Sequence, residues 1–121
     1  MTNFRLLVLA MTAAIGVVTA AAIGELGLPA GLWTFLNDLR HPWRLQFYSD
    51  LEIHLVLVAC WMTYRERSNL VGVCCGMATL ALGALFTGPY VLIASSRASG
   101  DVIAFLIGPH RVGRHRHSVG T

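Results

Sequence analysis

Residues 6–23 form an almost unbroken apolar run that follows a single cation, Arg5. A helix that crosses a bilayer needs roughly 20 apolar residues, so this run has the length of a membrane span. A cleaved signal peptide is the alternative interpretation, with the alanines at 20–22 as a cleavage region. Two further apolar stretches later in the chain favour a retained helix.

The composition also suits a lipid environment. The chain has 121 residues, of which 55% are hydrophobic and 12% are charged, and its mean hydropathy is +0.63. Soluble domains carry about 25% charged residues. All nine cations are arginines, and they do not form one patch interleaved with aromatic residues, so we expect no nucleic-acid partner.

The sequence predicts an all-α protein with three transmembrane helices, an interfacial helix and a basic C-terminal tail. The transmembrane domain is expected over residues 1–97 and the Arg/His-rich tail over residues 98–121. The spans are expected at about residues 5–24, 46–64 and 70–96. The third stretch is long enough to cross with tilt, and Gly88-Pro89 is expected to kink it near its end.

The connector between the first two spans contains a segment bracketed by Pro29 and Pro42. Its apolar residues share one helical face, which is typical of an amphipathic helix lying at the membrane interface. We expect Trp33 and Trp43 to lie near headgroup level, with Arg65 and Arg67 as interfacial anchors in the turn before the third span. An ordinary packed loop helix is the alternative.

Small residues recur at every fourth position in the first and third spans, and such faces let helices approach closely in lipid. The abundance of Ala and Gly in this chain is the alternative explanation. The helix-packing candidates are Gly16, Ala20, Gly24, Gly72, Gly76 and Gly83.

Three ionisable residues, Asp50, Glu52 and His54, lie at the mouth of the second span. On a helix, Asp50 and His54 are one turn apart and can meet, whereas Glu52 points elsewhere and needs a partner, for which Arg40 and Arg44 are the nearest candidates. Ionisable groups at membrane depth are costly and need partners. This cluster is therefore the first candidate site.

No metal site is expected. Cys60, Cys74 and Cys75 lie in apolar stretches and are expected to be small buried side chains, with a redox or metal role as the alternative. Arg and His alternate over residues 110–117, which is typical of a basic tail beside anionic lipid. A His cluster there is the alternative, but the interleaved arginines oppose a bound cation.

The region from Trp33 to about Arg97 resembles an uncharacterised family of small bacterial integral membrane proteins, a domain of unknown function. The similar features are Phe47-Tyr48-Ser49-Asp50, Trp61, the turn Tyr64-Arg65-Glu66-Arg67 and Gly88-Pro89-Tyr90-Val91-Leu92. The resemblance implies three spans and an activity that is unknown.

Orientation follows from the arginines. Three crossings place Arg5, Arg65 and Arg67 on one side and the other six arginines on the opposite side. The positive-inside rule then puts the C-terminal tail in the cytoplasm of a multi-pass protein of the bacterial inner membrane. The compact turn at Arg65–Arg67 argues the other way, because short loops weigh most.

These features favour a non-enzymatic role as an accessory or assembly subunit, which packs against a larger membrane complex of the respiratory or photosynthetic type and against lipid. One alternative is a membrane enzyme acting on a lipid or isoprenoid, with Asp50 or Glu52 as general acid and Tyr90 as helper. The other is a haem or chlorophyll-type pigment held by His54. No cofactor is expected on the first interpretation.

Overall fold

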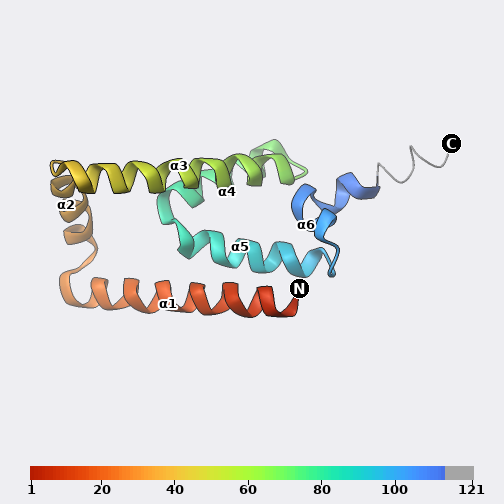
Figure 1. The fold of residues 1–121 in the computed structure, drawn as a ribbon, viewed down its shortest axis with the longest axis horizontal. Helices are drawn as coiled ribbons and strands as arrows, with labels where there is room; N and C mark the ends of the chain where they lie inside the picture. Colours follow the sequence, from red (N-terminus) through yellow and green to blue (C-terminus); the bar gives the residue numbers. More distant parts are fainter. Residues whose placement is uncertain (114–121) are drawn as a thin grey trace.

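A computed structural model of the chain describes residues 1–113. It contains only α-helices within that range, so the all-α prediction is confirmed there (Figure 1). The predicted Arg/His alternation continues past residue 113, and that part of it lies outside the described residues.

The first helix, α1, covers Thr2–Leu26 and ends at Gly27, whose φ is +76°. Its 25 residues extend about 37 Å, more than the hydrocarbon thickness of about 30 Å. Among residues 1–113, α1 is the one helix that is both long and apolar enough to cross a membrane. None of its residues is buried against the rest of the chain.

Two prolines set the next boundaries. Helix α2 covers Leu28–Asp38 and has Pro29 in its first turn, and α3 covers Pro42–Arg65 and begins at Pro42. His41 between them is extended, with φ −94° and ψ 121°, because a residue before proline is disfavoured in the helical region. The helix predicted between Pro29 and Pro42 is therefore present, as α2.

The stretch predicted as one third span is two helices. Helix α4 covers Asn69–Leu82 and α5 covers Ala84–Arg97, and the chain reverses between them at Gly83. Gly83 has φ +56° and ψ −132°, a conformation that a residue with a Cβ rarely adopts. The reversal therefore falls at Gly83, while Pro89, where the sequence predicts a kink, lies inside α5.

The two helices form a hairpin placed between α1 and α3. Helix α4 runs back along α3, and α5 turns round and runs along α1 (Figure 1). Each has 14 residues, or about 21 Å, which is shorter than a bilayer core. The N-terminus therefore lies at the same end as α6, Val102–Ile107, and α2 lies at the other end. A single third crossing would have put the N-terminus and α6 at opposite ends.

Glycines set both helix contacts of this hairpin. A Cβ on Gly72 would lie 2.7 Å from the Cα of Thr63, and one on Gly76 would lie 3.2 Å from the Cβ of Ala59. On the other side, a Cβ on Gly88 would collide with the side chain of Thr12. Close backbone approach at Gly72, Gly76 and Gly88 thus holds α4 to α3 and α5 to α1.

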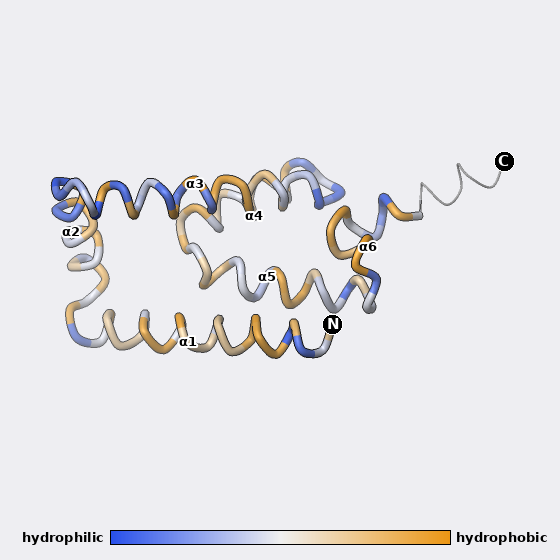
Figure 2. Tube along the Cα trace, in the orientation of Figure 1, coloured by the Kyte–Doolittle hydropathy of each residue, from blue (hydrophilic) through white to orange (hydrophobic). Residues whose placement is uncertain are grey.

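The helices bury little apolar surface. The accessible surface is 8807 Å², whereas a compact soluble chain of 13.1 kDa exposes about 6,400 Å². Hydrophobic residues cover α1 and much of α4 and α5, whereas hydrophilic residues gather toward the ends of the molecule and recur along α3 (Figure 2). An exposed apolar surface of this size marks a site of contact with other protein or with lipid.

Candidate functional site

A buried arginine organises the end of the molecule that carries α6. Arg65, the last residue of α3, is only 4% exposed. Its Nε donates to the Phe105 carbonyl at 2.8 Å, and its Nη2 donates to the Ala94 carbonyl at 3.4 Å. A buried guanidinium needs such acceptors because unpaired charge is costly to desolvate. Arg65, predicted to be an interfacial anchor, joins α3 to α5 and α6.

Glu66 and Tyr90 complete this polar cluster. The Tyr90 hydroxyl donates to Glu66 Oε1 at 2.6 Å, and Arg65 Nη1 lies 3.3 Å from both of those oxygens. The Trp61 ring meets the Tyr90 ring edge to face, with centroids 6.0 Å apart. The carboxylate, the guanidinium and the phenol therefore satisfy one another, which is how buried polar groups become stabilising.

Helix α6 is held at both ends by side chains. At its start, the Asp101 carboxylate accepts hydrogen bonds from the backbone N–H groups of Ile103 and Ala104, at 2.8 and 3.1 Å. At its end, Trp61 Nε1 donates to the Leu106 carbonyl at 2.9 Å, beside the Arg65 bond to Phe105. Six residues are too few for a stable isolated helix. The Asp101 bonds cap α6, and the Trp61 and Arg65 bonds fix it to α3.

Arg5 fixes α1 at the same end. Its Nη2 donates to the Ser95 carbonyl at 2.6 Å and its Nε to the Ser95 hydroxyl at 3.2 Å. Arg5, which precedes the apolar run in the sequence, therefore binds α1 to α5.

The acids and imidazole near the middle of α3 form a separate and exposed group. Asp50 and His54 do meet: the carboxylate lies 3.9 Å from Nδ1, and the Asp50 carbonyl lies 2.7 Å from the same nitrogen. Their side chains are 64% and 68% exposed. Glu52 is exposed, and it has no hydrogen bond or ion pair with any residue in 1–113.

The expected partners of Glu52 do not reach it. Arg44 pairs with Asp38, which also accepts a hydrogen bond from the Tyr48 hydroxyl at 3.2 Å. Trp33 and Trp43 are 68% and 76% exposed at this end of the molecule. The connector is thus stabilised by its own ion pair and leaves the carboxylates of α3 uncovered.

Tyr90 cannot assist Asp50 or Glu52. Its hydroxyl contacts Arg65, which lies 15 residues beyond Asp50 on the same helix, or about 22 Å along its axis. The structure therefore does not bring the three proposed catalytic residues together: Asp50 and Glu52 lie near the middle of α3, and Tyr90 lies near its end. No local pattern in the chain indicates this separation, because it depends on the reversal at Gly83.

Some of the predicted helix-packing residues lie against another helix, and others lie at open positions. Gly72 and Gly76 lie against α3, and Gly83 forms the reversal. A Cβ added at Gly16 or Gly24 would have no neighbouring atom within 4 Å, and Ala20 is exposed. The small-residue face of α1 is therefore open beyond Thr12.

The cysteines differ from expectation. Cys60 and Cys74 are exposed on the apolar surface, and Cys75 is half-buried. Within residues 1–113 no group of three His, Cys, Asp or Glu side chains could hold a metal ion.

Over residues 1–113 the structure is all-helical, and one of its helices, α1, is long and apolar enough to cross a membrane. No known protein family, curated protein or solved structure matches the chain. The resemblance to a three-span family is not tested by these comparisons and stays a prediction.

Proposed function

We propose that the chain is an integral membrane protein in which α1 and α3 cross the bilayer and α4–α5 is a re-entrant hairpin. Helix α1 has both the length and the apolar composition of a span, whereas α3, with 24 residues, has the length but carries Asp50, Glu52 and His54 within it. The apolar surface of α1 also supports this arrangement: α5 packs along part of it, yet no residue of α1 is buried within the described chain. Helix α2 then lies at the interface, where Trp33 and Trp43 meet the headgroups.

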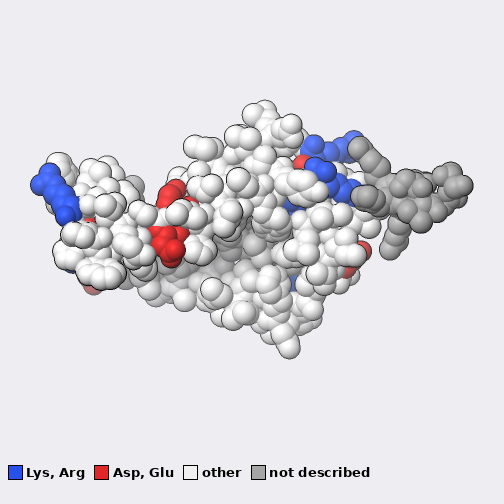
Figure 3. Space-filling model, turned by 45° about the horizontal axis from the view of Figure 1, so that its top comes forward, with Lys and Arg blue, Asp and Glu red and all other residues white. Residues whose placement is uncertain are grey.

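The arginines support one orientation. Arg5, Arg65, Arg67, Arg97 and Arg111 belong to the end that holds the N-terminus and α6, whereas only Arg40 and Arg44 belong to the connector. In Figure 3 the cationic side chains form one group beside α6 and a smaller one at the α2 end. The positive-inside rule then puts both the N-terminus and the C-terminal tail in the bacterial cytoplasm.

The function that this architecture supports best is that of an accessory or assembly subunit of a larger membrane complex. The observation that carries this proposal is the exposure of Asp50, Glu52 and His54 on the side of α3. At membrane depth such groups almost always face protein or a water-filled cavity, and the described chain leaves Glu52 without a partner. A partner subunit that supplies donors would cover them.

The open face of α1 offers a second surface on which a partner subunit could pack. Gly16 and Gly24 leave room for another helix to approach closely. Interhelical polar contacts in lipid contribute about 0.6–2 kcal/mol each, so close packing along α1 has to supply much of the affinity.

The test is purification from native membranes in mild detergent, followed by mass spectrometry of the proteins that co-elute. We expect larger subunits in fixed stoichiometry. They should be lost with Asp50→Asn combined with Glu52→Gln, and with Gly16→Leu, whose Cβ meets no atom of its own chain. Glu25→Gln, which removes a carboxylate at the end of α1, is the matched control. A clean monomer or homodimer of the wild-type chain would contradict the proposal.

A further inference from the structure

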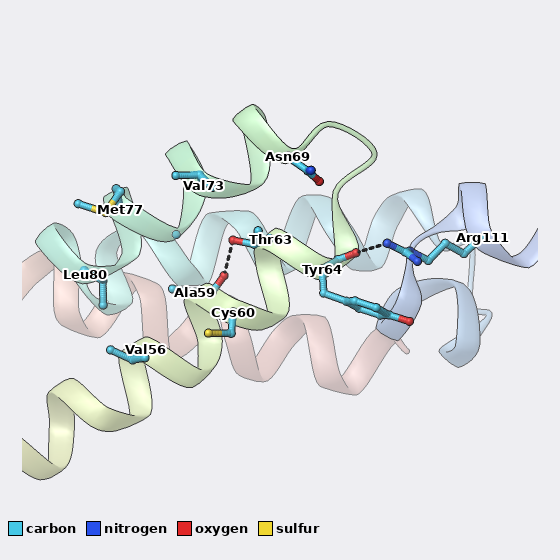
Figure 4. Close-up of a pocket in the computed structure, with 11 residues that line it drawn as sticks. Val56, Ala59, Cys60, Thr63, Tyr64, Asn69, Val73, Met77, Leu80 and Arg111 are labelled. Carbon is cyan, nitrogen blue, oxygen red and sulfur yellow. Dashed lines mark hydrogen bonds between the residues drawn. The ribbon is translucent and has the colours of Figure 1, made fainter.

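A groove of about 540 Å³ runs between α3 and α4 on the outside of the molecule. The polarity of the side chains that line it changes along its length, as Figure 4 shows. Polar groups stand at the cytoplasmic end of the orientation proposed above, and apolar side chains line the rest. The polar end is formed by Tyr64, Asn69 and Arg111, and the apolar part includes Val56, Met77 and Leu80.

Contacts with Tyr64 hold the Arg111 guanidinium at the polar end, and some of its N–H donors have no acceptor in the described chain. Its Nη2 donates to the Tyr64 carbonyl at 3.0 Å, and its guanidinium lies over the Tyr64 ring, 4.2 Å from the centroid. Nη1 has no acceptor among the residues that the structure describes. The guanidinium is thus oriented by α3 and still able to bind an anion.

Asn69 adds a second donor beside it. It is the first residue of α4, and its amide makes no hydrogen bond within the described part of the chain. The backbone N–H groups of this first helical turn also lack helical acceptors. No carboxylate among the described residues lines the groove, so Arg111 gives the polar end a net positive charge.

The length and lining of the groove suit an acyl chain. From Asn69 to Leu80 it extends 11 residues along α4, or about 16 Å. Beyond Asn69, the residues of α4 that line it carry no polar side chain: Val73, Gly76, Met77 and Leu80. A hydrocarbon chain can therefore lie along the groove in contact with both helices.

We propose that this groove binds an anionic phospholipid, with the phosphate on Arg111 and Asn69 and one acyl chain along α3 and α4. The inference rests on the membrane placement proposed above. Positive charge at one end and an apolar channel at the other match the two parts of such a lipid. The volume also falls within the usual range for small-molecule sites, about 300–1,000 Å³.

Cys60 offers a direct readout because it lines the groove and is exposed. The full chain carrying Cys74→Ser and Cys75→Ser is purified in detergent and treated with N-ethylmaleimide, while dioleoyl phosphatidylglycerol or dioleoyl phosphatidylcholine is added to the micelles. We expect phosphatidylglycerol to slow the modification of Cys60 at least fivefold and to saturate near one lipid per chain. Phosphatidylcholine should need about tenfold more lipid.

Two variants locate the phosphate. Arg111→Gln should raise the half-protecting concentration of phosphatidylglycerol about tenfold, and Asn69→Ala, which keeps the charge, about threefold. Arg97→Gln removes a cation from the same end of the molecule but not from this groove, and it should change the value less than twofold.

Three results would overturn the proposal: equal shifts in Arg111→Gln and Arg97→Gln, no protection of Cys60 by either lipid, or equal protection by inorganic phosphate alone. These failures are distinct from failure of the membrane proposal, which would appear as a chain that stays soluble without detergent.

Discussion

Arg65 and Phe105 are 40 residues apart in the sequence, and a hydrogen bond of 2.8 Å joins the guanidinium of the first to the carbonyl of the second. This bond brings α6 onto the end of α3, where Trp61 donates to the Leu106 carbonyl and its ring packs against the Phe105 ring. The cytoplasmic end of the proposed bundle is therefore closed by side chains from α3, α5 and α6.

Replacing Arg65 by Gln should release α6. The change removes the donors to Phe105 and Ala94 and leaves Glu66 with only the Tyr90 hydroxyl. Breaking a buried pair of this kind costs about 3 kcal/mol. Thermal unfolding in detergent and hydrogen exchange at residues 102–108 measure the effect. Arg67→Gln, at an exposed residue two positions away, serves as control, and equal stability of the two variants would show that the cluster does not hold α6.

The change in stability on replacing Gly83 by Ala has opposite signs for a reversal at Gly83 and for one continuous helix. With φ +56° and ψ −132°, Gly83→Ala should destabilise the protein by about 1–3 kcal/mol. If residues 70–96 were one continuous helix, the same change would raise stability by up to about 1 kcal/mol, because alanine favours helix over glycine. Thermal unfolding of the purified protein separates these outcomes.

The glycines of α4 and α1 should respond differently to the same change. A Cβ on Gly72 meets the backbone of Thr63 at 2.7 Å, so Gly72→Ala should cost about 1–3 kcal/mol as the two helices move apart. Gly16→Ala meets nothing and should leave the stability of the isolated chain unchanged or slightly higher. Equal losses in both variants would contradict the packing between α3 and α4.

The ionisable residues near the middle of α3 should matter for assembly and not for folding. Asp50→Asn and His54→Ala change side chains that are about two-thirds exposed, and such changes usually shift stability by less than about 0.5 kcal/mol. Unfolding of the isolated chain measures this. A large loss of stability would show that these groups support the fold itself and would weaken the argument for a partner there.

Local signals in the sequence predicted the helices up to Arg65. Pro42 explains the break before α3, and the apolar run after Arg5 explains α1. The reversal at Gly83 was missed because glycine is common in the apolar stretch around it, and Gly72 and Gly76 remain helical. The burial of Arg65 was missed for another reason: its acceptors lie on α5 and α6, and local patterns carry no information about such contacts.

The central claim, that α4–α5 enters and leaves the bilayer on one side, is tested most directly by locating both ends of the chain. A tag on the N-terminus and a tag on the C-terminus are probed with protease in right-side-out and inside-out membrane vesicles. The proposed arrangement predicts that both tags are cleaved only in inside-out vesicles, from the cytoplasmic face. Cleavage of the two tags from opposite faces would contradict the re-entrant hairpin and would support three crossings.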